Sequence, residues 1–202
     1  MIIVKLGGSL ALSPHLKGWC EAVARGAGRA VVVPGGGPFA DAVRAAQPRM
    51  GFDDRAAHRM ALLAMEQFGC ALVGFGPPLT LVESAAAIRP ALRAGGVPVW
   101  APTRMVLAAK NVPWSWDVTS DSLAAWLAGV LGATRLLLVK AVEPSAGPLR
   151  AADLVARGII DPAFPRFLGA SGARAYIAGP SQHAAVAAAL AAGAAAGARI
   201  EV

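Results

Sequence analysis

Two hydrophobic patterns alternate along the chain. Short runs rich in Val, Ile and Leu are typical of buried strands, and the longer Ala- and Leu-rich segments between them carry apolar residues at helical spacing. The short runs predict strands at Ile2–Leu6, Ala30–Val33, Ala71–Gly74, Val97–Trp100, Arg135–Val139, Arg174–Ala178 and Arg199–Val202. The longer segments predict helices at Pro14–Arg25, Pro38–Ala46, Asp54–Phe68, Leu81–Arg93, Asp121–Leu131 and Ser181–Ala196.

This order of elements predicts an α/β fold. Strands that are apolar throughout and alternate with helices form a mostly parallel central sheet covered on both faces, which is a three-layer αβα sandwich. The length of 202 residues suits one domain, and neither a repeat nor a linker-like segment divides the chain. We therefore expect a single domain over residues 1–202.

Composition narrows the class of protein. Hydrophobic residues make up 56% of the chain and charged residues 15%, which excludes a disordered protein. The apolar run at residues 184–198 is shorter than the roughly 18–20 residues that span a bilayer, and the N-terminus lacks the pattern of a signal peptide. The two cysteines form no metal-binding motif. We expect a cytoplasmic protein without a membrane partner or a metal site.

The net charge of +7 raises the question of a nucleic acid partner. Only four of the 19 basic residues are lysines, and the arginines stand singly among alanines without forming a stripe. One Tyr and six Phe offer few rings for stacking on bases. We therefore interpret the charge as a solvated basic surface and expect no nucleic acid partner.

Two glycine runs lie where a parallel sheet binds ligands, at the carboxyl ends of its strands. One run follows the first predicted strand and the other follows the second; they consist of Gly7, Gly8, Gly35, Gly36 and Gly37. Either run alone is compatible with a plain tight turn. Together they favour a phosphate site, because glycine backbones let N–H groups approach an anion closely. The GxxxxGK(S/T) and GxGxxG fingerprints are absent, which argues against Walker-type nucleotidases and Rossmann dehydrogenases.

Three charged residues stand near the same edge of the predicted sheet. Lys5 lies in an apolar strand, where a charge is costly unless it meets an anion. Lys140 directly follows the strand Arg135–Val139, and Asp121 opens a predicted helix. The functional interpretation is that the two lysines bind phosphate and that Asp121 holds a lysine or a magnesium ion. The structural alternatives are lysines that reach solvent at the strand ends and an aspartate that caps its helix.

Three motifs together resemble the amino acid kinase superfamily, which includes acetylglutamate, aspartate and uridylate kinases. They occur in the family's order as VKLGGS at residues 4–9, VPGGGPFA at 33–40 and TSDSLA at 119–124. The resemblance implies an αβα sandwich that transfers the γ-phosphoryl group of Mg·ATP to an oxygen acid. It also implies ATP and Mg²⁺ as cofactors, a small phosphorylated molecule as substrate, and a homodimer or larger homo-oligomer.

Within this superfamily the chain resembles the small archaeal kinases of methanofuran biosynthesis more closely. These phosphorylate aminomethylfuranmethyl phosphate to the diphosphate. The similarity rests on AHRMA at residues 57–61, SWDVTSDS at 115–122 and DPAFP at 161–165, and it extends over nearly the whole chain. It implies a phosphate group as the acceptor. A uridylate or carboxylate kinase of the same fold and a non-catalytic nucleotide or anion binder are the alternatives.

The resemblance also assigns roles to individual residues. Lys5 and Asp121 are implied to be catalytic. Phosphate or nucleotide contacts are implied for Gly7, Gly8, Ser9, Lys140 and Gly147. Acceptor contacts are implied for Gly35, Gly36, Gly37, His58, Trp116, Asp117 and Thr119, although a histidine such as His58 is also compatible with a plain core or surface position.

One segment departs from the family's pattern. After the strand that ends at Val139, members usually carry a TDVDG-like nucleotide loop, whereas this chain reads KAVEPSAGP at residues 140–148. The usual aspartates and glycine are replaced, and Glu143 and Gly147 stand nearby. Nucleotide binding is therefore the part of the resemblance that this sequence supports least.

Overall fold

The computed structural model describes residues 1–144, 147, 149–194 and 196–202. Its strands form one sheet in the order β3-β4-β2-β1-β5-β7-β8-β6. The strands are β1 Ile2–Leu6, β2 Ala30–Pro34, β3 Leu79–Val82, β4 Val97–Trp100, β5 Arg135–Val139, β6 Leu149–Arg150, β7 Arg174–Ala178 and β8 Ala198–Glu201. All pairs are parallel except β7 with β8, which are antiparallel.

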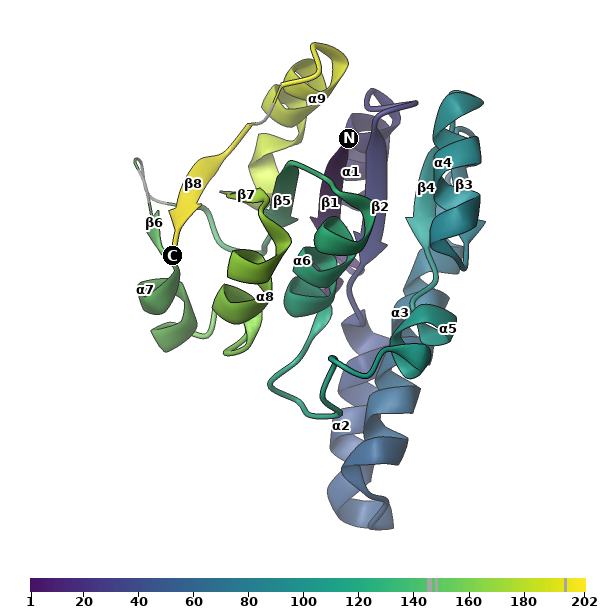
Figure 1. The fold of residues 1–202 in the computed structure, drawn as a ribbon, viewed down its shortest axis with the longest axis vertical. Helices are drawn as coiled ribbons and strands as arrows, with labels where there is room; N and C mark the ends of the chain where they lie inside the picture. The colour runs from purple at the N-terminus through teal and green to yellow at the C-terminus, as the bar shows by residue number, and fades with distance from the viewer. Residues whose placement is uncertain (145–146, 148, 195) are drawn as a thin grey trace.

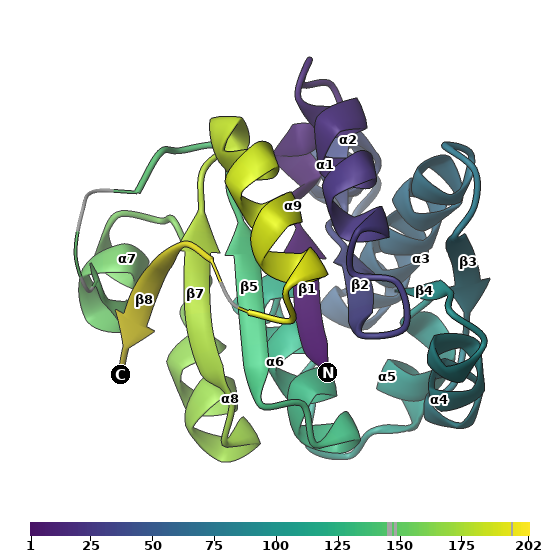
Figure 2. The same cartoon turned by 90° about the horizontal axis from the view of Figure 1, so that it is seen from above.

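Helices cover both faces of this sheet (Figures 1 and 2). They are α1 Leu16–Ala24, α2 Gly37–Met50, α3 Asp54–Val73, α4 Ala85–Arg93, α5 Thr103–Ala108, α6 Ser120–Leu131, α7 Ala151–Ala156, α8 Phe164–Ser171 and α9 His183–Ala191. Helices α1 and α9 pack on one face, and α6 and α8 pack on the other, as Figure 2 shows. The predicted three-layer α/β sandwich is confirmed.

The buried side chains form two cores, one on each side of the sheet, because successive residues of a strand point to opposite faces. In β1, Ile3 joins the core beneath α6 and α8, whereas Val4 and Leu6 join the core beneath α1 and α9. Strand β1 is buried along its whole length at the centre of the sheet. Hydrophobic burial on both faces therefore fixes the strand from which Lys5 extends.

One predicted element is wrong and a second begins too early, and both lie near β3. The predicted strand Ala71–Gly74 belongs to the end of α3, because Phe68 and Leu72 stand four residues apart on one buried helix face. The predicted helix Leu81–Arg93 starts only at Ala85, after the Ser84 side chain accepts a hydrogen bond from Ala87 N at 3.3 Å. The residues before it form the edge strand β3.

Other boundaries also differ from the prediction. Helix α2 continues through Pro48 to Met50 and ends at Gly51, whose φ of +73° is a left-handed cap that glycine adopts readily. Helix α9 ends at Ala191, before the predicted limit at Ala196. The sequence pattern did not predict α5, α7, α8 and β6, since all are short.

Several arginines have structural roles at the ends of helices. Arg89 donates a hydrogen bond to the carbonyl of Leu131 at the end of α6 (3.0 Å), and Arg29 donates one to Ala191 at the end of α9 (2.8 Å). A cation is favourable at a helix C-terminus because the unpaired carbonyls carry partial negative charge. Part of the basic excess therefore stabilises the fold. None of the helices in the described ranges is both long enough and apolar enough to cross a membrane.

Candidate active site

Lys5 and Lys140 extend from neighbouring strands toward the same face of the sheet. Lys5 is opposite Leu138 in the parallel register of β1 and β5, and Leu138 belongs to the core beneath α6. Lys140 follows Leu138 by two residues, so the alternation of side chains directs it to that same face. The strand register thus brings together two lysines that are 135 residues apart in the sequence.

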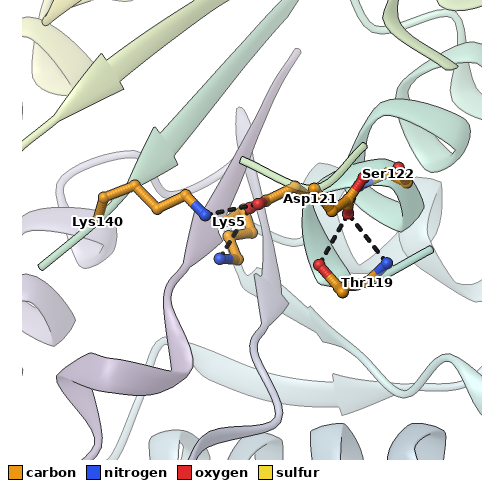
Figure 3. A network of polar contacts seen from close by, with 6 residues as sticks. Lys5, Thr119, Asp121, Ser122 and Lys140 are labelled. Carbon is orange, nitrogen blue, oxygen red and sulfur yellow. Dashed lines mark hydrogen bonds and ion pairs between the residues drawn. The ribbon is translucent and has the colours of Figure 1, made fainter. Parts of the chain in front are cut away.

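Asp121, in the first turn of α6, lies between these lysines (Figure 3). Its Oδ1 is 2.9 Å from Lys5 Nζ, and its Oδ2 accepts a hydrogen bond from Lys140 Nζ at 2.5 Å. The side chains of Asp121 and Lys5 are 3% and 5% exposed, and that of Lys140 is 14% exposed. Two buried cations share one buried anion, so the lysine centre formed by these three residues keeps a positive charge that favours a further anion.

Burial and the neighbouring charges together set the pKa values of Asp121 and Lys140. Burial by itself raises the pKa of Asp121, but the charges of Lys5 and Lys140 outweigh it and hold that pKa below its ordinary value. Burial lowers the pKa of Lys140 to about 8, and the neighbouring charge of Lys5 adds to the shift, while Asp121 and Asp161 oppose it. Lys140 therefore changes charge close to neutral pH.

We expect kcat/KM to fall as the pH rises through about 8, because Lys140 then loses the positive charge that its expected contact with phosphate oxygens requires. Below that pH Lys140 is protonated and the centre is fully charged. The measurement is a pH profile of kcat/KM from pH 6 to 10. In the control variant Lys140→Arg, the guanidinium stays charged and any remaining activity should lack this basic limb. A wild-type profile that stays level across pH 7–9.5 would contradict the assignment of Lys140.

The two glycine runs touch each other beside the lysine centre. An added Cβ at Gly35 would lie 2.3 Å from the backbone nitrogen of Gly8, and one at Gly8 would lie 2.2 Å from the nitrogen of Gly37. A Cβ at Gly7 would lie 2.7 Å from the Val139 carbonyl oxygen. Backbones can approach this closely only where side chains are absent. The loops after β1 and β2 therefore pack backbone against backbone, and α2 starts at this contact.

A cavity of about 300 Å³ opens next to the glycine contact. Its walls come from the loops after β1 and β2, from α2 and α3, and from the segment that enters α6. The lining includes Gly8, Ser9, Gly36, Gly37, Asp54, His58, Trp116 and Thr119, together with apolar side chains of Leu62, Met65, Val118 and Leu123. The sequence-predicted acceptor residues Gly36, Gly37, His58, Trp116 and Thr119 thus line one space.

His58 is buried in the wall of this cavity. The residue is 6% exposed, its Nε2 has no hydrogen-bond partner among the described residues, and burial lowers its pKa below the ordinary value. A neutral imidazole with an unpaired nitrogen at a cavity wall has the capacity for one more hydrogen bond. A bound molecule in the cavity can supply the partner that the protein does not.

A chain of polar contacts joins α2, α3 and the loop before α6 at the cavity rim. Trp116 Nε1 donates a hydrogen bond to Gln47 Oε1 at 2.7 Å, and Gln47 Nε2 donates one to Asp54 Oδ1 at 2.8 Å. Arg44 lies over the Trp116 ring at 4.4 Å from its centre. The sequence analysis missed Arg44 and Gln47, since their helical positions carry no motif.

Some predicted residues lie apart from these groups. Ser9 is exposed at the cavity, whereas Asp117 is exposed and outside the cavity lining. Gly35 is buried at the glycine contact and also lies outside the lining. Gly147 is exposed with φ +93°, and no hydrogen bond found in the described ranges joins it to the lysine centre. Residues 145, 146 and 148 of the expected nucleotide loop lie outside the described residues.

The motifs and their geometry correspond to a known family. A family model described as the amino acid kinase family matches residues 1–144. The chain belongs to the amino acid kinase family. The [5-(aminomethyl)furan-3-yl]methyl phosphate kinase of Methanocaldococcus jannaschii is 25% identical over 145 residues, which cover 71% of this chain and 67% of that protein.

Solved structures of this family share the fold. The uridylate kinase of Archaeoglobus fulgidus superposes with a TM-score of 0.74 at 18% identity, covering 99% of each chain. An isopentenyl phosphate kinase of T. acidophilum, solved as a product complex, superposes with a TM-score of 0.60 at 13% identity over 100% of each chain. The family membership predicted from the sequence is confirmed, and the chain is a kinase, that is, a phosphotransferase.

Proposed function

We propose that this amino acid kinase transfers the γ-phosphoryl group of Mg·ATP to the phosphate of a small phosphate monoester, and that the acceptor is [5-(aminomethyl)furan-3-yl]methyl phosphate. The observation that carries the proposal is the cavity beside the lysine centre. Its volume of about 300 Å³ is at the small end of the range for small-molecule sites, which favours a compact acceptor over a nucleotide. The similarity to the M. jannaschii kinase supports the same acceptor.

The lining of the cavity matches the chemistry of this acceptor part by part. Leu62, Met65 and Val118 offer an apolar surface for the furan ring. The carboxylate of Asp54, held by Gln47, offers a partner for the ammonium group. The backbone N–H groups at the start of α2 and the unpaired Nε2 of His58 offer donors for the acceptor phosphate.

In the proposed reaction an oxygen of the acceptor phosphate attacks the γ-phosphorus of ATP in line, and the bond to the β-phosphate oxygen breaks to release ADP. Lys5 neutralises the charge that is shared among the transferring oxygens, and Lys140 does so on the leaving side. Asp121 keeps both ammonium groups in place. The protein contributes position and charge, and it forms no covalent intermediate.

The described residues offer no set of free ligands for a resident metal ion. Both oxygens of Asp121 are engaged by lysines. The described part of the chain also holds no cluster of three or more His, Cys, Asp or Glu side chains suited to a metal. Mg²⁺ would therefore enter on the phosphates of ATP, which is its usual mode of binding with nucleotides.

A homodimer or larger homo-oligomer is part of the proposal and is tested by light scattering.

A coupled ADP-release assay tests the proposed acceptor. [5-(Aminomethyl)furan-3-yl]methyl phosphate, UMP, acetylglutamate and aspartate are offered in parallel, and we expect the highest kcat/KM with the furan. An analogue in which a methyl group replaces the aminomethyl group is the control, because it keeps the ring and phosphate but leaves Asp54 without a cation. Turnover of UMP alone would overturn the furan assignment, and turnover of none would favour an anion-binding role.

A further inference from the structure

The buried carboxylate of Asp161 is bonded entirely to the segment that enters α6. Its Oδ2 accepts hydrogen bonds from Thr119 N at 2.9 Å, Thr119 Oγ1 at 2.7 Å and Ser122 N at 3.0 Å. Its Oδ1 accepts one from Ser122 Oγ. Asp161 is 7% exposed and takes part in no ion pair with any described residue. Four donors therefore compensate for the burial of this charge.

These contacts make Asp161 the N-terminal cap of α6, supplied from another part of the chain. Thr119 occupies the N-cap position, but its own side chain makes no capping bond. An N-cap side chain ordinarily accepts from the third residue of the helix, which here is Ser122. Asp161 accepts that bond instead, from the segment between α7 and α8.

The same segment holds α6 at a second point. Ala163 N, two residues after Asp161, donates a hydrogen bond to the carbonyl of Asp117 at 3.3 Å. Helix α8, which begins at Phe164, then packs along α6. The entry into α6 is thus fixed by hydrogen bonds on both sides of Thr119.

Asp121 stands between the two residues that Asp161 binds. Because Thr119 and Ser122 are held, the first helical turn cannot rotate, and the Asp121 side chain stays directed at the two lysines (Figure 3). Thr119 also lines the cavity, so the same cap aligns one wall of the proposed acceptor site with the lysine centre.

We propose that Asp161 is a positioning residue, which sets the orientation of Asp121 and thereby the geometry of Lys5 and Lys140. The kinetic part of this proposal rests on the proposed function. Three charged groups affect the pKa of Lys140: Lys5 from β1, Asp121 from α6 and Asp161 from the segment before α8. Loss of the Asp161 charge therefore lowers the pKa of Lys140 in two ways. It alters the position of Asp121, and it removes a negative charge that acts on Lys140 directly.

The test is the variant Asp161→Asn, whose amide is of similar size but cannot accept from all four donors. Lysine side chains are labelled with ¹³C, and the four lysines of the chain give four signals that Lys17→Arg, Lys110→Arg and Lys140→Arg assign by difference, the remaining signal being that of Lys5. We expect the titration midpoint of Lys140 to fall below its wild-type value. We also expect kcat to fall by about 10- to 100-fold with the KM for ATP changed by less than about twofold.

The NMR measurement needs no substrate, so it distinguishes failure of this proposal from failure of the proposed function. An unchanged Lys140 midpoint in folded Asp161→Asn protein overturns the proposal, even where thermal stability is lost. Where the wild-type protein turns over one of the four acceptors, an unchanged kcat in Asp161→Asn overturns the proposal as well. If none of the four acceptors is turned over, a lowered Lys140 midpoint in Ser122→Ala, which keeps the Asp161 charge, still supports the proposal.

A second variant keeps the test decisive if Asp161→Asn does not fold. Ser122→Ala removes one of the four hydrogen bonds to Asp161 and should shift the Lys140 midpoint in the same direction by a smaller amount. Ser84→Ala is the matched control, because it removes the side-chain cap of α4 and leaves α6 intact. It should lower the thermal midpoint and leave the Lys140 titration unchanged, whereas an equal shift in both serine variants overturns the proposal.

Discussion

Replacement of Lys5 by alanine should lower kcat by a factor on the order of 10²–10³. The Lys5 ammonium group is buried at the end of β1, 2.9 Å from Asp121, where the proposed reaction places the transferring phosphoryl group. Loss of one such charge removes roughly 3–4 kcal/mol of stabilisation that applies mainly in the transition state. The measurement is kcat from the coupled ADP-release assay with saturating ATP and the best acceptor.

Two further variants make the Lys5 result specific. Lys110→Ala removes an exposed lysine and should leave kcat unchanged. Lys5→Arg keeps the charge but replaces a compact ammonium group by a rigid fork, so it should restore little activity. Circular dichroism and tryptophan fluorescence establish that each variant is folded. Turnover by folded Lys5→Ala within threefold of wild type would mean that Lys5 has no catalytic role.

Replacement of Asp121 by asparagine should lower the free energy of unfolding at pH 7 by about 3–5 kcal/mol. The change leaves the ammonium groups of Lys5 and Lys140 buried and facing one another without an anion. We also expect kcat to fall, since the two lysines then repel each other from their positions. Urea unfolding gives the free energy, and the exposed Asp153→Asn is the control.

The stability of Asp121→Asn should recover partly as the pH rises. Removal of the carboxylate takes away a charge that raises the pKa of Lys140, which burial and Lys5 already hold at about 8. Between the lowered pKa of Lys140 in the folded variant and the ordinary pKa of lysine, the unfolded state binds more protons than the folded state. The free energy of unfolding therefore increases with pH there. If Asp121→Asn lowers the free energy of unfolding as much at pH 9.5 as at pH 7, this account of the lysine centre is wrong.

Local sequence patterns place the two glycine loops, Lys5 and Lys140 at one edge of the sheet, for a physical reason. In a parallel sheet, residues that directly follow buried strands meet at one edge, so local patterns around Lys5, Gly35 and Lys140 carry three-dimensional information. The strand at Ala71–Gly74 was predicted wrongly because a short apolar run is compatible with either a strand or the last turn of a buried helix.

Local sequence patterns could not predict the contacts between site residues that are far apart in the chain. Gln47 joins Trp116 to Asp54, and Asp161 caps a helix that begins about 40 residues earlier in the chain. The DPAFP segment at residues 161–165 contributed to the family resemblance, but an Asp-Pro pair by itself predicts only a turn. Only the packing of α8 along α6 brings Asp161 to Thr119.

The backbone contact between Gly8 and Gly35 constrains how this enzyme can diverge. A side chain at either position collides with the opposite loop, so a single substitution in one loop has no compensating single substitution in the other. In the proposed reaction these glycines lie beneath the two phosphates, so this part of the site cannot change by single substitutions. The walls, which come from α2, α3 and the segment before α6, carry no such restriction. If the proposed reaction is right, new acceptors should arise through substitutions around Arg44, Gln47 and Trp116, with the proposed spacing between donor and acceptor phosphates unchanged.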